Sequence, residues 1–181
     1  MAGGRSSRMG VDKSFIPYLG QPLINHVLER TANLGRETIV ITNRPHDYAH
    51  LGLPMFEDVY RDKGPLGGFH AALTYAATPY VLIVACDMPW LQQALLAHQI
   101  DLRHTADIVV PRWNKFPEPM HAIYSQACLP HITTNLEAGL LKLVAFYGRV
   151  TVRYLDQEEI CRVDPEGRSF RNINTPEDLV G

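Results

Sequence analysis

Cysteine, charge of one sign and long hydrophobic runs are all scarce in this 181-residue sequence. Its cysteines, Cys86, Cys128 and Cys161, have neither the spacing of a zinc site nor the even count of a disulfide framework. The longest uninterrupted apolar run, Tyr80 to Cys86, is far short of the roughly 18–20 residues that span a bilayer. A disulfide scaffold and a membrane-spanning protein are therefore not expected.

The charge is nearly balanced and evenly spread along the chain. Seventeen Lys and Arg residues against nineteen Asp and Glu residues leave a formal net charge of -2. A general electrostatic hold on nucleic acid or on a membrane is not expected, so a polyanionic ligand needs a local site. The hydrophobic fraction of 46% and the charged fraction of 20% are typical of a globular protein. Because no charged-then-apolar leader opens the chain, a cytoplasmic protein is expected.

Short β-branched runs alternate with segments of helical periodicity. Leu23, Ile24, Val27 and Leu28 follow one face of a helix that Pro22 opens. The alternation predicts an α/β fold: a Rossmann-like, mostly parallel, doubly wound sheet with helices on both faces, in one domain over 1–181. Further helices are expected after Pro65, after Pro89 and over 126–137 and 140–147. The expected strands are 38–42, 80–85, 107–111, 120–125 and 150–155.

The opening loop is rich in glycine and basic residues. Gly3, Gly4 and Gly10 allow backbone N–H groups to form a concavity that suits phosphate, and Arg8 and Lys13 add positive charge. The glycine, lysine and serine are not adjacent as a Walker A loop requires. Composition alone leaves a phosphate loop and a solvated N-terminal tail about equally plausible.

The segment AGGRSSRMGVDKSFIPYLGQPLINHVLERT resembles the opening signature of the molybdenum cofactor guanylyltransferase family, a branch of the nucleotidyltransferases also called MobA-like NTP transferases. Three later motifs follow in family order: GPLGG at 64–68, ACDMP at 85–89 and NINTPEDL at 172–179. The resemblance covers nearly the whole chain. The Asp12-Lys13 pair favours this branch over the sugar-phosphate nucleotidyltransferases.

The resemblance implies Mg²⁺ held by Asp87, with Lys13 and Asp87 as the catalytic residues. One or two carboxylates with phosphate oxygens are an ordinary Mg²⁺ site. Asp58 would contact the ribose or base, and Gly64 the purine edge. The implied nucleotide-binding residues are Met1, Ala2, Gly3, Gly4, Arg8, Lys13, Asp58, Gly64, Asp87 and Asn174.

Plainer interpretations of some of these residues stay open. Asp87 suits the N-cap of the helix that Pro89 opens, Asp58 could be a surface acid, and Asn174 could be a helix cap before Pro176. A lone histidine such as His121 is more often packed than catalytic. Cys86 has no obvious base beside it in sequence and is interpreted as packing rather than as a nucleophile.

The implied reaction transfers GMP from GTP to a molybdopterin-type cofactor and releases pyrophosphate. Ile41 lies where some guanylyl-transferring relatives have asparagine, so CTP or another nucleotide remains an alternative, as does a non-catalytic GTP-binding module. Molybdoenzyme maturation proteins are the expected partners.

One departure from the family pattern concerns the first strand. In relatives a buried central strand runs directly into the Gly-Gly loop, and Met1 takes the position of its last leucine. A doubly wound sheet without that strand is expected to leave backbone groups of its neighbours unpaired and a gap in the core.

Overall fold

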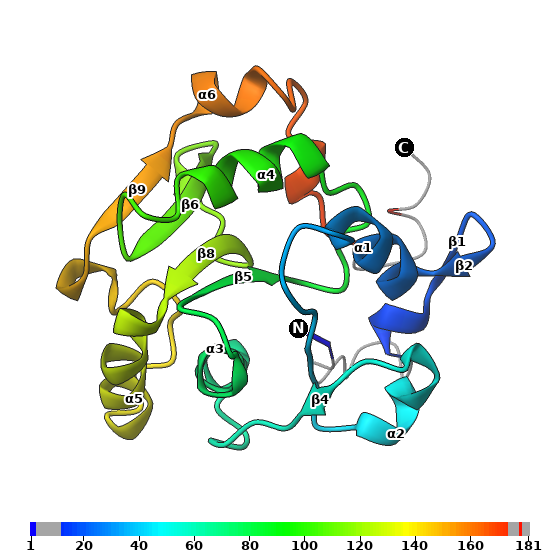
Figure 1. Ribbon diagram of the computed structural model, residues 1–181, viewed down its shortest axis with the longest axis horizontal. Coiled ribbons are helices and arrows are strands. Elements are labelled where there is room, and N and C mark those ends of the chain that lie inside the picture. The colour runs from blue at the N-terminus through cyan, green and yellow to red at the C-terminus, as the bar shows by residue number, and fades with distance from the viewer. Residues whose placement is uncertain (3–11, 174–177, 179–181) are drawn as a thin grey trace.

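The computed structural model describes residues 1–2, 12–173 and 178, and its framework is a mixed sheet between two layers of helices (Figure 1). The sheet contains β5 (Tyr80–Val84), β8 (His121–Ser125), β6 (Ile108–Trp113) and β9 (Val152–Leu155), in that order. Strand β8 is antiparallel to both β5 and β6, whereas β6 and β9 are parallel. The expected α/β sheet is confirmed, with β8 as its reversed strand.

A second, parallel pair lies beyond β5. It is formed by β3 (Val40–Ile41) and β4 (Met55–Phe56), with Val40 opposite Met55. The backbone of Met1 and Ala2 lies between β3 and β5 and bonds to both. Two short hairpin ribbons complete the strands: β1 (Pro17–Tyr18) with β2 (Gln21–Pro22), and β7 (Phe116–Pro117) against the end of β6.

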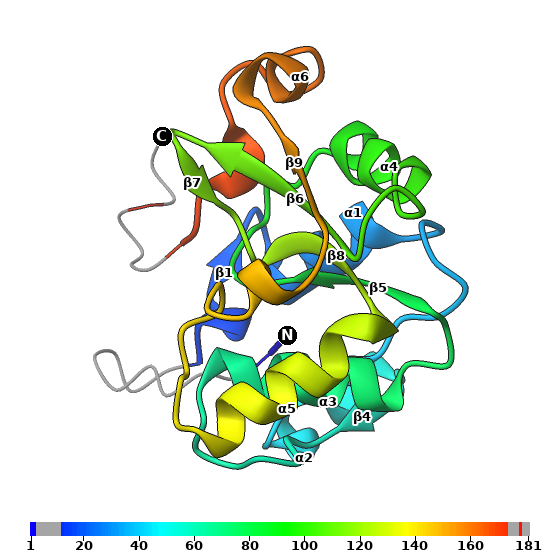
Figure 2. The same cartoon turned by 90° about the vertical axis from the view of Figure 1, so that its left-hand side faces the viewer.

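Helices cover both faces of the sheet (Figures 1 and 2). On one face, α1 (Leu23–Thr31) contacts α4 (Gln93–Asp101), and α4 also contacts β8. On the other, α3 (Pro65–Tyr75) packs against α5 (Leu129–Glu137) and β5. Two short helices lie at the periphery, α2 (Pro45–Tyr48) and α6 (Gln157–Cys161). None of the helices in the described part of the chain is long and apolar enough to cross a membrane.

Prolines and glycines set the helix ends much as the sequence indicates. Pro22 is the N-cap of α1, and Pro65 and Pro130 lie in the first turns of α3 and α5, where a missing N–H costs nothing. The expected helix over 140–147 is wrong, because that segment is a series of turns ending in a 3₁₀ turn at Tyr147–Arg149. Its buried side chains, Phe146 and Tyr147, are adjacent and not spaced for one helical face.

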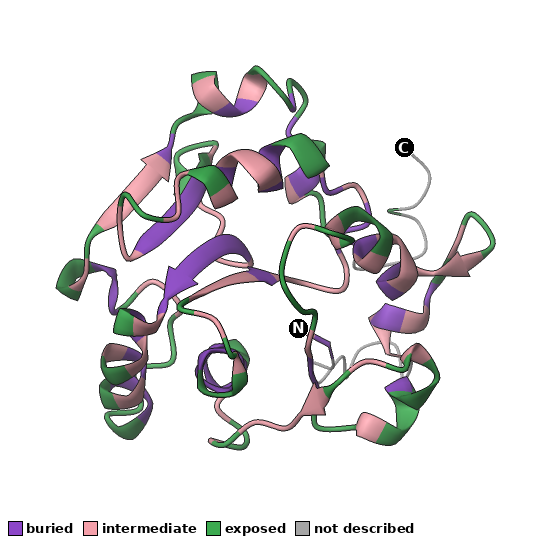
Figure 3. Ribbon diagram, in the orientation of Figure 1, coloured by how far each residue is buried: buried purple, intermediate pink, exposed green. Residues whose placement is uncertain are grey.

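The core is deepest around β8, all five of whose residues are buried (Figure 3). Tyr124 packs its ring at 5.0 Å from that of Phe69 on α3, and its hydroxyl lies 2.7 Å from that of Tyr147. This polar pair satisfies two hydroxyl groups in an otherwise apolar cluster. It also ties the 140–147 turns to the sheet, which explains how a segment without a helix stays in place.

One glycine is required by both conformation and space. Gly167 has a φ of 60°, and a Cβ there would lie 2.2 Å from the indole of Trp113, which also packs on Phe170. Gly139, after α5, has a φ of 70° but nothing within 4 Å of its Cβ position. The pair therefore separates backbone strain from steric clash.

We expect Gly167→Ala to lower the free energy of unfolding by about 2–4 kcal/mol, and Gly139→Ala by about 1–2 kcal/mol, because only the first substitution adds a clash to the left-handed strain. Urea denaturation of the two variants measures the difference. Equal losses would contradict the packing of Trp113 against the Gly167 backbone.

Candidate functional site

The candidate site lies where the carboxyl ends of β3 and β5 meet the start of the chain, the usual position for ligands in such sheets. Lys13 opens the 3₁₀ turn Lys13–Phe15, and Asp87 follows β5. Their side chains face each other, with Nζ 4.0 Å from Oδ2, and both are partly exposed. The structure thus brings together the two residues expected to be catalytic, although they are far apart in sequence.

The environment of Asp87 opposes its own ionisation. Burial raises the pKa of Asp87 above its ordinary value, and Lys13 lowers it in part through its positive charge. A carboxylate in such a place is stabilised by additional positive charge, from a cation or a ligand. Asp87 is bonded through its carbonyl to the amide of Ile173, so the chain's final segment is tied to this loop.

A network of side chains holds the Asp12-Lys13 turn. Asp12 accepts from the amide of Ser14 at 3.0 Å and from the hydroxyl of Tyr48 at 2.5 Å, and it pairs with the guanidinium of Arg44. The Tyr48 side chain is fully buried, and burial raises its pKa further above the ordinary value. This hydroxyl therefore stays protonated and remains a donor to Asp12. Lys13 is positioned by its neighbours on both sides of the turn.

Cys86 belongs to the same network and not to the chemistry. Its Sγ lies 2.9 Å from Oγ of Ser14, which donates to it. Burial raises the pKa of the Cys86 thiol. A neutral, buried thiol is a poor nucleophile, which supports its interpretation as packing.

Asp58 lies on the opposite side of the site, next to the start of α3. Its backbone amide donates to Oδ1 of Asn43 at 2.9 Å, and Nδ2 of Asn43 donates to its carboxylate at 2.8 Å. The Cβ position of Gly68 is 3.6 Å from Oδ1 of Asp58 and also meets the side chain of Met1. Gly64 is the N-cap of the same helix. Met1, Asp58 and the GPLGG motif therefore meet.

Other expected contacts cannot be placed. Gly3, Gly4, Arg8 and Asn174 lie outside the described residues. Ala2 is buried and bonds to Ile41 at 2.9 Å. Asn43 was not singled out from the sequence. Its signal was available, since it comes directly after a strand, at the carboxyl end where functional side chains gather.

Glu118 is a second residue that sequence reasoning missed. It precedes β8, and the following Met120 packs with Met88, Val84 and Ala85, so this segment lies beside the Asp87 loop. Burial raises the pKa of Glu118 to about 7. A loop glutamate has no sequence signal for this, because the burial comes from distant segments. His121, by contrast, is packed: burial lowers its pKa to about 4, and its ring lies 5.2 Å from that of Phe170.

The donor set suits a hard cation held mainly by a ligand. Across residues 1–2, 12–173 and 178, no three His, Cys, Asp or Glu side chains form a group that could hold a metal ion. Asp87 alone offers a partly exposed carboxylate beside a lysine. A single carboxylate, completed by phosphate oxygens and water, is a common arrangement for Mg²⁺ and an uncommon one for Zn²⁺.

The fold and this pairing of a lysine with an aspartate at the end of a buried strand are those of a nucleotidyltransferase. The chain belongs to the family described as MobA-like NTP transferase domain, which it matches over residues 1–152. The family expected from the four ordered motifs is confirmed.

Named relatives agree with this assignment. A protein of Pelotomaculum thermopropionicum named probable molybdenum cofactor guanylyltransferase is 34% identical over 180 residues, covering 99% of this chain and 88% of that protein. A molybdenum cofactor guanylyltransferase of Desulfosudis oleivorans is 34% identical over 181 residues, covering 99% of this chain and 90% of its own. The solved structure of molybdopterin-guanine dinucleotide biosynthesis protein A from Archaeoglobus fulgidus matches with a TM-score of 0.85 at 27% identity, covering 99% of this chain and 92% of that one.

We predict that Tyr48→Phe lowers the free energy of unfolding by about 1–3 kcal/mol, because it removes a buried donor to a charged carboxylate. The ring packing against Phe15, at 4.9 Å, is kept. Tyr75→Phe is the control, since Tyr75 is exposed and stacks on Phe56 through its ring. Denaturation curves that coincide for the two variants would show that the Tyr48 hydroxyl does not hold the turn.

A second prediction concerns Glu118 and pH. Its pKa of about 7 in the fold lies above the ordinary 4.5, so the stabilisation is complete below the ordinary value and is lost as pH rises through about 7. Because the side chain is only partly buried, we expect Glu118→Gln to remove a pH dependence of about 1–2 kcal/mol between about pH 5 and pH 8. Thermal unfolding across that range measures it. Glu166→Gln, at an exposed carboxylate paired with Arg168, should keep the wild-type pH dependence.

Proposed function

We propose that this protein transfers GMP from GTP to the terminal phosphate of a molybdopterin-type cofactor and releases pyrophosphate. The observation that carries the proposal is the 4.0 Å pairing of Lys13 with Asp87 at the carboxyl end of β5, reached directly from a glycine-rich opening segment. The family membership and the names of the relatives support the choice of reaction.

The two charged residues divide the work in this proposal. The ammonium group of Lys13 meets the β- and γ-phosphate oxygens and stabilises the charge that develops on the departing pyrophosphate. Asp87 holds Mg²⁺, which when bound neutralises charge at the α-phosphate. The acceptor phosphate is already an oxyanion, so no side chain needs to act as a general base. Catalysis then depends on positioning and electrostatic stabilisation.

The nucleoside half of GTP is assigned to the other side of the site. Asp58 is held by Asn43 beside the N-terminus of α3, where its free carboxylate oxygen can accept from a ribose hydroxyl or a guanine N–H. Gly64 allows backbone groups to approach the purine edge. The opening segment, with Met1, Ala2, Gly3, Gly4 and Arg8, is assigned to the phosphates, and Asn174 to the metal side of the site.

The surroundings of the reaction follow from its substrates. A GTP-dependent reaction is placed in the cytoplasm, and molybdoenzyme maturation proteins would receive the dinucleotide product. Incubation with each of the four nucleoside triphosphates and the molybdopterin acceptor, with pyrophosphate as the readout, tests the choice of GTP. Release with CTP in preference to GTP would replace guanylyl by cytidylyl transfer.

Asp87→Asn should reduce pyrophosphate release at limiting Mg²⁺ by roughly 100-fold or more, because it removes the formal charge that binds the cation while preserving the side chain's shape. Its stability should be equal to or slightly above that of the wild type, since the buried charge is lost. Asp101→Asn, at the exposed last residue of α4, is the matched control. Wild-type turnover of Asp87→Asn at limiting Mg²⁺ would overturn the metal assignment.

A further inference from the structure

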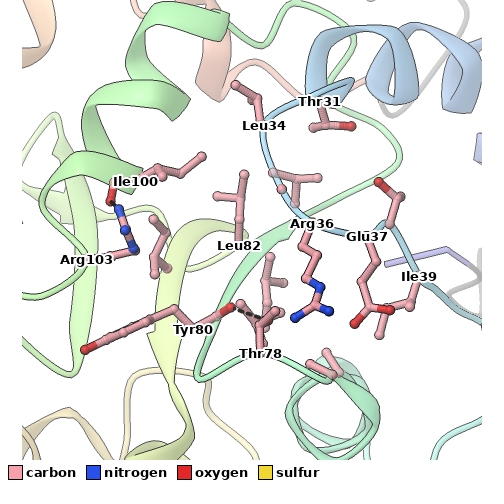
Figure 4. Close-up of a pocket in the computed structure, with 18 of the residues that line it drawn as sticks. Thr31, Leu34, Arg36, Glu37, Ile39, Thr78, Tyr80, Leu82, Ile100 and Arg103 are labelled. Atoms are coloured by element: carbon pink, nitrogen blue, oxygen red, sulfur yellow. Dashed lines mark hydrogen bonds between the residues drawn. The ribbon is translucent and has the colours of Figure 1, made fainter.

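A cavity of about 560 Å³ separates β3 from β5 (Figure 4). Both strand segments line it, with Ile39 and Ile41 on one side and Tyr80–Val84 on the other. Helices from both layers border the same space. Leu34 and Ile100 close it on the α1 and α4 side, whereas Ala72 and Ala76 close it on the α3 side. The cavity therefore passes through the plane of the sheet and is not a hollow on one face.

Met1 and Ala2 define the width and direction of this cavity. The nitrogen of Met1 donates to the carbonyl of Val84 at 3.0 Å, and the carbonyl of Met1 accepts from the amide of Cys86 at 3.1 Å. Bonding to residues on both sides of one partner residue is the parallel pattern. Ala2 donates to Ile41 at 2.9 Å on the opposite edge. At this end, then, β3 and β5 are one strand apart, and the filling strand is parallel to β5.

The backbone edges of the cavity continue the same pattern. Because the carbonyl of Val84 turns toward Met1, the alternate residue Leu82 directs its backbone groups to the same edge, away from β8. On the other strand, Val40 and Thr42 donate toward β4, so Ile39 and Ile41 face the cavity. At the far end the hydroxyl of Thr78 donates to the carbonyl of Tyr80 at 2.9 Å, which ends the open edge (Figure 4).

The side chains around the cavity indicate the chemistry of its occupant. Apolar groups face it from both layers, and the two alanines of α3 leave room for larger side chains. Charged groups, those of Arg36, Glu37 and Arg103, lie at the periphery (Figure 4). An extended segment whose alternate side chains point to opposite faces would need to be apolar on both.

We propose that the cavity is a slot for an extended apolar segment of about five residues, joined to Met1 and parallel to β3 and β5. The length matches Tyr80–Val84, which borders the slot. A segment joined to Met1 is favoured over a separate peptide because the nitrogen of Met1 already lies in the line of the strand, so attachment gives a high effective concentration. Filling the slot would anchor the start of the glycine-rich segment beside the site.

The test fuses Ile-Val-Leu-Val-Leu directly ahead of Met1. The melting temperature should rise by about 5 °C or more, and the amides of Leu82 and Ile39 should become more protected from hydrogen exchange. A fusion with proline in place of the central leucine is the control, because proline cannot donate to a sheet neighbour and is excluded from central strands.

A pair of variants locates the effect in the slot. Ala76→Phe, at the C-cap of α3, fills the cavity and should abolish the gain. Ala138→Phe, at the C-cap of α5 and outside the slot, should preserve it. Each extended variant is compared with the same variant without the extension.

The readouts do not use the transferase reaction, so the proposal can fail while the proposed function stands. Equal melting temperatures for the apolar and proline fusions, or unchanged exchange at Leu82 and Ile39, would overturn it. Equal stabilisation by the free pentapeptide at equimolar concentration would overturn the assignment to a segment joined to Met1. So would a gain that requires dimer formation.

Discussion

The backbone of Met1 and Ala2 is the constraint on which the site depends, because it joins the β3–β4 pair to the main sheet at the end where the functional side chains gather. Asp58 stands on the β4 side of this junction and Asp87 on the β5 side. If the two edges separated, the nucleoside and phosphate halves of the site would no longer be aligned. Three main-chain hydrogen bonds therefore set the distance on which transfer geometry depends.

Three aspartates near this junction serve different purposes because their partners differ. Asp12 is committed to Tyr48, Arg44 and the Ser14 amide, so it shapes the chain. Asp58 is held on one side by Asn43. Asp87 faces Lys13 at the longer distance of 4.0 Å and is partly exposed. Only a carboxylate whose bonding capacity is not fully used can bind a cation or ligand strongly, which separates Asp87 from Asp12 despite their identical chemistry.

Local signals explain what could be predicted from the sequence. The strand at 80–84 and the helices opened by prolines depend on periodicity and short-range sterics, and the structure places them within a few residues. The turns at 140–147 were not predictable, because Phe146 and Tyr147 are positioned by the Tyr124 hydroxyl and the core. The same applies to the Tyr48–Asp12 contact and to the burial of Glu118. These depend on segments that only the folded chain brings together.

Strand β8 has a further consequence for how the chain reaches its fold. It is the shared partner of β5 and β6, and its pairing with β6 joins nearer parts of the sequence than its pairing with β5. Closing the shorter loop loses less conformational entropy, so a β6–β8 unit is favoured early, and β5 joins across the longer loop that contains α4. The phosphate-contacting end of β5 is thus completed late, and during synthesis it waits for residues that emerge from the ribosome well after Asp87.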